Sequence, residues 1–313
     1  MKMIVTVTMN PAVDKTVELG TLRRGELNRL LNVKYDAGGK GINVSKTIRE
    51  LGGESIAVGF LGGNTGKTIV NVMEDRKIRH DFIWVDGETR TNTKVLETDG
   101  TVTELNEPGP EIGTEQVEKL LKKLEMYAEE GALFVLSGSV PRGVSKNIYA
   151  DIICRLHEKR AKVLLDADGE LFRKALEAGP DIIKPNRAEL EEYAGFGPGA
   201  SEKEIAALAT ELLSRGMETV AVSMGAQGAM LFRPDCAVKC PALSVKAHST
   251  VGAGDAMVAA LACAWEQGLD TEETIKLCIA ASAGAVTTVG TNPPSRELVD
   301  ALKEQVVIKK IGE

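Results

Sequence analysis

The feature that most restricts the fold of this chain is a regular alternation of short apolar runs and longer amphipathic segments after residue 113. Strand patterns occupy 132–137, 162–166, 181–184 and 218–223, and helix patterns occupy 114–130, 145–160, 170–177, 202–215, 254–267, 271–289 and 295–304. Strands that alternate with helices form a parallel sheet covered on both faces. The sequence therefore predicts an α/β fold with a doubly wound, mostly parallel sheet.

Two β-rich segments, 10–36 and 82–107, do not follow this alternation. The second contains short strand patterns separated at Asp99-Gly100, a dipeptide typical of a hairpin turn. We expect the two segments to meet in a small separate sheet that forms a lid. The core domain would then comprise 1–9, 37–81 and 108–313, and the lid 10–36 and 82–107.

Charge and composition exclude several classes of partner. The net charge is −7 and there is no block dense in Lys or Arg, so we expect no nucleic-acid partner. The longest apolar stretch, 256–265, is too short to cross a bilayer, so we expect no membrane partner. Five scattered cysteines fit a reducing compartment, and we expect a cytoplasmic protein that binds a small molecule.

The segment 249–261 carries the most specific chemical signal. Gly252, Ala253 and Gly254 lead directly into a helix that is apolar on all sides and is therefore predicted to be buried. First-turn amides of such a helix have no partners within it and form an anion site. Asp255 in that turn can act as a general base towards an alcohol. Asp255 could instead only cap the helix, but a cap does not require three small residues before it.

A second glycine-rich turn opens the helix near residue 42. Gly38 and Gly39 precede Lys40 and Asn43, so backbone donors, an ammonium group and a carboxamide come together at the start of this helix. These groups can hold a sugar phosphate or its hydroxyls. The alternative is a tight strand-to-helix connection without a ligand.

Two further segments are less specific. Asn186 and Glu189 share one face of a helix start and could orient Mg²⁺ through its waters, or form an ordinary capping box. Residues 222–228 form a strand that ends in a glycine turn, which suits a nucleotide phosphate or a plain hairpin. Residues 62–68 resemble a P-loop, but Leu61 stands where the motif needs glycine, so we expect no phosphate site there.

The order and separation of residues 38–45 and 250–255 resemble the two signatures of the ribokinase-like pfkB carbohydrate kinases, and the resemblance extends over essentially the whole chain. Residues 8–14 and 88–92 look like the hexose-phosphate branch of that family. The resemblance implies ATP-dependent phosphorylation of a ketohexose phosphate. Fructose 1-phosphate is the favoured substrate, and the 6-phosphates of tagatose and fructose are the alternatives.

The resemblance also implies a role for each matching residue. Asp255 would be the catalytic base, and the amides of Gly252, Ala253 and Gly254 the anion hole. Sugar-phosphate ligands would be Asp14, Arg29, Gly38, Gly39, Lys40, Asn43, Arg90 and Ser137. ATP ligands would be Lys184, Asn186, Ser223, Gly225, Gly228 and Val251, with Asn186 and Glu189 serving Mg²⁺ through water. Members of the family pair through the lid, so a homodimer is expected.

Two other functions remain open at this point. A non-catalytic sugar-phosphate sensor would be favoured by loss of the aspartate or the glycine turn, and both are intact. A ribose or nucleoside kinase has an uncharged acceptor, for which the cations Arg29, Lys40 and Arg90 would be surplus.

Overall fold

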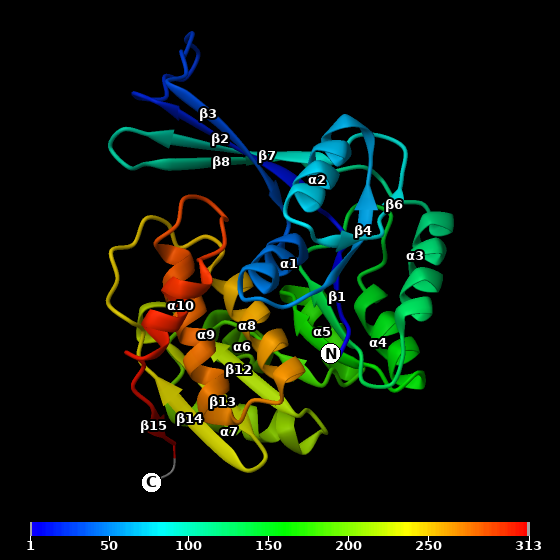
Figure 1. Cartoon of the computed structure of the whole chain (residues 1–313), viewed down its shortest axis with the longest axis vertical. Coiled ribbons are helices and arrows are strands. Elements are labelled where there is room, and N and C mark those ends of the chain that lie inside the picture. The colour runs from blue at the N-terminus through cyan, green and yellow to red at the C-terminus, as the bar shows by residue number, and fades with distance from the viewer. Residues whose placement is uncertain (1, 312–313) are drawn as a thin grey trace.

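The computed structural model describes residues 2–311 and contains a large sheet of eleven strands (Figure 1). The strand order is β15-β14-β13-β12-β11-β10-β9-β1-β4-β5, and β6 also pairs with β4. The strands are β1 (Ile4–Thr8), β4 (Ile56–Leu61), β5 (Arg79–His80), β6 (Ile83–Trp84), β9 (Leu133–Ser137), β10 (Lys162–Asp166), β11 (Ile182–Ile183), β12 (Thr219–Ser223), β13 (Ala229–Arg233), β14 (Cys236–Cys240) and β15 (Lys309–Lys310). Neighbours from β12 to β5 are parallel, and those from β12 to β15 are antiparallel. The expected mostly parallel sheet is confirmed.

Helices cover both faces of this sheet because successive strand residues point to opposite sides. In β1, Val5 and Val7 pack with one hydrophobic cluster and Ile4 packs with the other. The first cluster includes side chains of α3 (Thr114–Tyr127), α4 (Ile148–Glu158), α5 (Gly169–Glu177), α6 (Arg187–Ala194) and α7 (Glu202–Ser214). The second includes side chains of α1 (Lys40–Glu50), α8 (Ala253–Gln267), α9 (Thr271–Val286) and α10 (Arg296–Lys303). The fold is therefore a three-layered α/β structure.

A separate sheet of four strands projects from one end of the core (Figure 1). Its order is β3-β2-β7-β8, with β2 (Ala12–Leu19), β3 (Asn32–Gly38), β7 (Arg90–Glu97) and β8 (Val102–Asn106). The parallel pairing of β2 with β7 joins the two β-rich segments, as expected. Residues 83–84 differ from the expectation: they pair with β4 in the large sheet, because this short segment still follows the edge of the core.

The base of the small sheet is fixed to the core. Val13 and Ala37 pack against Ile69 and Met73 of α2 (Gly63–Asp75). The fully buried Lys46 of α1 donates from Nζ to the carbonyl oxygen of Ala37 at 2.7 Å. These contacts hold the inner end of the small sheet, while its far end extends away from the core (Figure 1). Within residues 2–311, no helix has the length and apolar character needed to cross a membrane.

Candidate active site

The candidate site lies where the parallel strands end, the usual position for ligands in such sheets. Ser137, Asp166 and Ser223 end β9, β10 and β12, and Lys184 follows β11 directly. The first residues of α1 and α8 meet these strand ends, and the small sheet contributes residues from outside the core. Together they enclose a cavity of about 760 Å³.

The start of α8 has the geometry of an anion site. Gly252 has φ +87°, a left-handed conformation that favours glycine. A side-chain carbon on Gly254 would lie 3.7 Å from Lys184 Nζ, so the bare backbone here leaves room beside a cation. The helix that follows is buried from Asp255 to Ala264. Its first-turn amides, with the positive end of the helix dipole, border the cavity.

Asp255 is buried at this helix start and accepts a hydrogen bond on Oδ2 from Asn43 Nδ2 at 2.8 Å. Burial, followed by the nearby charge of Asp166, raises the pKa of Asp255 to about 6. The positive charges of Lys40 and Lys184 oppose this rise. A carboxylate with such a pKa is ionised at neutral pH and is still basic enough to accept a proton.

Asp166 joins the two lysines of the site. Its Oδ2 lies 3.3 Å from Lys40 Nζ, its Oδ1 lies 3.0 Å from Lys184 Nζ, and the residue is only 2% exposed. Although burial raises the pKa of Asp166, the two ammonium groups lower it below its ordinary value. Burial likewise lowers the pKa of Lys40, but Asp166 and Asp255 raise it well above its usual range. Both partners of this pair therefore stay ionised.

Asp166 was not predicted as a site residue. The available signal was its place at the last position of a buried strand, the edge where parallel sheets hold ligands.

The small sheet presents polar side chains to the cavity. Arg90 donates from Nε and Nη2 to the carbonyl oxygen of Asn10 at 3.3 and 3.1 Å. Asn92 donates to Asp14 Oδ1 at 3.2 Å, and Lys94 Nζ lies 3.9 Å from Asp14 Oδ2. Asn92 and Lys94 line the cavity and were not predicted. The sequence did carry a signal for them: Asn92 and Lys94 follow Arg90 at intervals of two residues, which places all three on one face of a strand.

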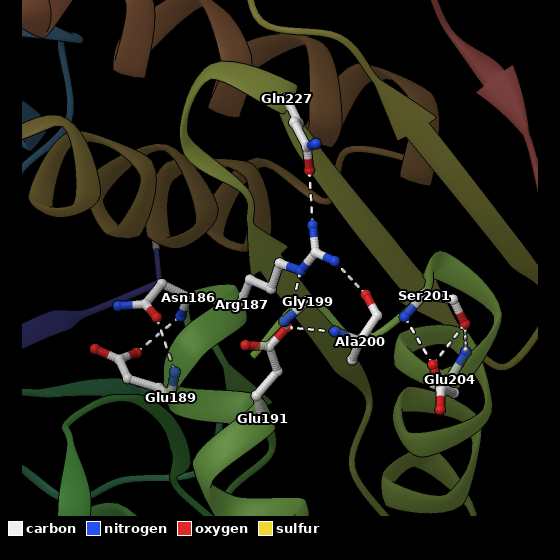
Figure 2. A network of polar contacts seen from close by, with 9 residues as sticks. All are labelled: Asn186, Arg187, Glu189, Glu191, Gly199, Ala200, Ser201, Glu204 and Gln227. Atoms are coloured by element: carbon white, nitrogen blue, oxygen red, sulfur yellow. Dashed lines mark hydrogen bonds and ion pairs between the residues drawn. The ribbon is translucent and has the colours of Figure 1, made fainter. Parts of the chain in front are cut away.

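The other end of the cavity is built by α6 and a tight turn. Asn186 and Glu189 form a reciprocal capping box, with Asn186 Oδ1 accepting from the Glu189 amide at 2.9 Å (Figure 2). The backbone of Asn186 bridges to Ser223, which leads into the 3₁₀ turn η1 (Gly225–Gln227). Gly228 closes that turn with φ +93°, and a side chain there would collide with the carbonyl oxygen of Cys240.

The predicted site residues that line the cavity are Asp14, Gly39, Lys40, Asn43, Arg90, Lys184, Asn186, Glu189, Ser223, Gly225, Gly228, Val251, Gly252, Ala253, Gly254 and Asp255. They come from segments that are far apart in the sequence, and the fold brings them together. Their individual roles stay predictions.

Arg29, Gly38 and Ser137 are not among the lining residues in the described part of the chain. Arg29 is exposed in the loop between β2 and β3. Position 38 has no room for a side chain, because the first side-chain carbon would come within 2.6 Å of Asp14 Oδ2. Ser137 lies buried beneath the site, in register with Asp166.

Several buried polar atoms at the cavity have no hydrogen-bond partner among residues 2–311. They include Asn43 Oδ1, Asn92 Oδ1 and Thr291 Oγ1, and all three residues line the cavity. Buried polar groups are nearly always paired in folded proteins. Unpaired atoms that gather around one cavity therefore indicate a polar ligand.

The P-loop-like segment at 62–68 forms the start of α2, and a protein carboxylate occupies it. Glu88 accepts hydrogen bonds from the amides of Asn64 and Thr65 at 3.2 and 3.0 Å. These bonds lower the pKa of Glu88 below its ordinary value. The first-turn amides of α2 thus have an internal partner, consistent with the absence of a phosphate site that the sequence predicted.

The fold and the site together define an α/β phosphotransferase with a buried aspartate at a helix start. Residues 3–298 match the pfkB family of carbohydrate kinases, and the chain belongs to that family. Kinases of this class transfer a phosphoryl group from ATP to a sugar. The chain is 36% identical to a 1-phosphofructokinase of Haemophilus influenzae, with 99% of each chain covered. It is 33% identical to a 1-phosphofructokinase of Vibrio cholerae, with 99% of this chain and 98% of that protein covered.

Among solved structures, the chain resembles phosphofructokinase-2 from Escherichia coli. The TM-score is 0.92 at 27% identity, with 97% of this chain and 99% of the other covered. That enzyme has been solved in complex with fructose-6-phosphate and as a tetrameric inhibited form.

Proposed function

We propose that the protein is a 1-phosphofructokinase, which transfers the γ-phosphoryl group of ATP to the 6-hydroxyl of fructose 1-phosphate and forms fructose 1,6-bisphosphate. The observation that carries this proposal is the position of Asp255, buried at an open helix start and facing the cavity. The names of the full-length relatives support the choice of sugar.

In the proposed reaction, Asp255 accepts the proton of the sugar hydroxyl as that oxygen attacks phosphorus. Asn43 holds the carboxylate by its 2.8 Å hydrogen bond and leaves Oδ1 of Asp255 for the substrate. The amides at the start of α8 and the ammonium groups of Lys40 and Lys184 stabilise negative charge on the transferring group. Positioning and charge stabilisation are the main contributions a protein makes to phosphoryl transfer.

The phosphate already present on the sugar would bind beneath the small sheet, where Arg90 and Lys94 line the cavity. Asp14 lies beside Lys94 and would accept hydrogen bonds from sugar hydroxyls. We propose that the small sheet acts as a lid, because water in the closed site would compete with the sugar as acceptor.

ATP would bind at the opposite end, with its phosphates between Lys184 and the glycine turn 225–228 and its base near Val251. A magnesium ion would neutralise charge on these phosphates, and Asn186 and Glu189, which line the cavity, would hold it through water. Burial first, and the charge of Asp166 after it, raise the pKa of Glu189 above its ordinary value, which a nearby cation would reverse. Mg²⁺ needs only one or two protein carboxylates beside phosphates and water, so the lack of a three-residue metal cluster within 2–311 fits this arrangement.

We also propose that two copies pair through the small sheet in the cytoplasm. On the sheet face that points away from the cavity, the apolar side chains of Val33, Tyr35 and Leu105 are 40%, 59% and 58% exposed. Exposed large apolar side chains on one face of a small sheet suit an interaction site. The five cysteines are unpaired, as in a reducing compartment.

A second candidate substrate is fructose 6-phosphate, or its isomer tagatose 6-phosphate. The observation in its favour is the likeness to phosphofructokinase-2, which was solved with fructose-6-phosphate. These ketohexose phosphates carry a phosphate at one end and a hydroxymethyl group at the other. A cavity with cations at one end and a base at the other can therefore accept either orientation.

The test is a steady-state comparison of fructose 1-phosphate, fructose 6-phosphate, tagatose 6-phosphate, fructose and ribose, with ADP release as the readout. We expect the highest kcat/KM for fructose 1-phosphate and background turnover for ribose. Preference for one of the 6-phosphates would replace the proposed substrate, and sugar-independent ADP release with all five would remove the kinase proposal.

The same assay tests the general base. Asp255→Asn should lower kcat by about two to four orders of magnitude, the usual contribution of a general base, with a much smaller change in the KM of the sugar. Turnover near the wild-type rate would exclude Asp255 from the mechanism.

A further inference from the structure

Arg187 connects three separate parts of the chain beside the nucleotide end of the cavity (Figure 2). Its Nε donates to Glu191 Oε1 at 3.0 Å, one turn further along α6. Its Nη1 donates to Gln227 Oε1 at 2.9 Å, and its Nη2 donates to the carbonyl oxygen of Ala200. One side chain therefore links α6, the turn η1 and the segment that leads into α7.

The Glu191 end of this link is rigid. Glu191 is only 8% exposed, and its Oε1 also accepts hydrogen bonds from the amides of Gly199 and Ala200 at 3.0 and 2.8 Å. Although burial raises the pKa of Glu191, the hydrogen bonds from Arg187 and the two amides lower it below its ordinary value. The guanidinium of Arg187 is thus held by a fixed, ionised partner on the side away from the turn.

The Gln227 end is the less constrained one. The turn η1 has only three residues, and the hydrogen bonds that close it join Met224, Gly225, Gln227 and Gly228 to one another. Gly225, Ala226 and Gly228 form part of the cavity wall, whereas the side chain of Gln227 points outward to Arg187 (Figure 2). The bond to Arg187 therefore holds the outer side of a turn whose inner side faces the ligand.

We propose that Arg187 is a positioning residue for the nucleotide. It fixes the turn 225–228 relative to Asn186 and Glu189, so that the distance between these two walls of the phosphate site stays constant. Arg187 is suited to this task because it lies between Asn186 and Glu189 in the sequence. This inference rests on the proposed ATP-dependent function. It adds a residue that does not itself line the cavity within the described chain.

The experiment compares Arg187→Ala, Arg187→Lys, Gln227→Ala and the double variant Arg187→Ala/Gln227→Ala. ADP binding is measured by calorimetry without sugar, and the KM values of ATP and of the sugar phosphate are measured separately. Loss of a hydrogen bond to a charged group should weaken ADP binding and raise the KM of ATP roughly tenfold in Arg187→Ala. Arg187→Lys, which can keep only part of the fork, should lie between it and wild type.

The double variant should be no worse than Arg187→Ala alone, because both substitutions break the same link. The KM of the sugar phosphate should stay within twofold in every variant. The matched control is Arg215→Ala, which removes an arginine that follows α7 and donates to Tyr193 Oη of α6 at 2.9 Å without reaching the turn. It should leave ADP binding unchanged.

Unchanged ADP affinity in Arg187→Ala, an equal rise in both KM values, or additive effects of the two substitutions would overturn the proposal. Should Arg187→Ala fail to fold, the exposed Gln227→Ala tests the same link from its other end. Failure of the proposed function has a different signature, because wild-type protein would then not bind ADP or would not turn over any sugar phosphate.

Discussion

The environment of Asp255 disfavours the ionised form of its carboxyl group. Burial and the charge of Asp166 raise its pKa from 3.8 to about 6, so the ionised form is less stable here than in water. In the folded state Asp255 holds its proton to higher pH than in the unfolded chain. The free energy of unfolding should therefore fall as pH rises from about 4 to about 6, and the loss should persist above that range.

From this follows a prediction about stability. Asp255→Asn, which removes the charge at nearly constant shape, should raise the free energy of unfolding at pH 8 by roughly 3 kcal/mol, or about 5 °C in Tm. The gain should vanish near pH 4, where Asp255 is protonated. Thermal unfolding of both proteins at the two pH values checks this, and a variant less stable than wild type at pH 8 would contradict it.

The same pKa predicts the pH dependence of turnover. A general base must be deprotonated, so kcat/KM for the sugar, which reports the free enzyme, should fall about tenfold per pH unit below about pH 6 and reach a plateau above pH 7. Sugar phosphates titrate in the same range. The residual kcat/KM of Asp255→Asn supplies the control, since it shares the titration of the sugar phosphate and should lack that of Asp255. A wild-type profile flat down to pH 5 would be incompatible with Asp255 as the base.

At the scale of the element, α8 permits a test that separates stability from chemistry. Gly252 and Gly268 flank this helix, with φ +87° and +67°, so alanine is strained at both ends. Each substitution should cost on the order of 1 kcal/mol of stability. Only Gly252→Ala should also lower kcat/KM, by tenfold or more, because it displaces amides that face the cavity. Similar activity losses in the two variants would show that the effect is general destabilisation.

Elements with strong hydrophobic periodicity were predictable from the sequence. The strand at 162–166 was predicted with the bounds that the structure shows, and the apolar helix after Gly254 begins one residue earlier than expected. The strand β11 lies within the predicted strand 181–184. The strand β15 was not predicted, because a two-residue strand of this kind arises from pairing with its neighbour rather than from local preference. The helix α6 was recognised only as a helix start, since it has just eight residues.

Residues of the candidate site were also predictable only where the local sequence carries a signal. Residues in glycine turns, such as Lys40 and Asp255, carry a local signal. The neighbouring glycines are visible in the sequence, and they are needed where the backbone lacks room for a side chain or has a left-handed conformation. Asp166 carries none: a buried aspartate becomes informative only when the fold brings Lys40 and Lys184 to it. Arg187 likewise carries no local signal, because its three partners lie in segments that sequence spacing does not relate.

At the scale of the whole molecule, the proposed dimer depends on one face of the small sheet. Leu105→Asp places a charge on the side of β8 that points away from the cavity, and we expect it to convert a dimer to a monomer in light scattering. The matched control is Val102→Asp, a residue on the same strand that is similarly exposed at 54% but points to the opposite side. A monomeric wild-type protein, or equal effects of the two substitutions, would exclude this interface.

Alternate residues in the strands of the small sheet point to opposite faces of the sheet. In β7, Arg90, Asn92 and Lys94 point to the cavity, and Val95 lies on the side that carries the exposed apolar residues. Inserting one residue into β7 would exchange its two sides and turn the cations outward and the side chains of Thr91, Thr93 and Val95 towards the sugar. A change in the length of β7 by a single residue would therefore disable sugar recognition and the proposed pairing of two copies together.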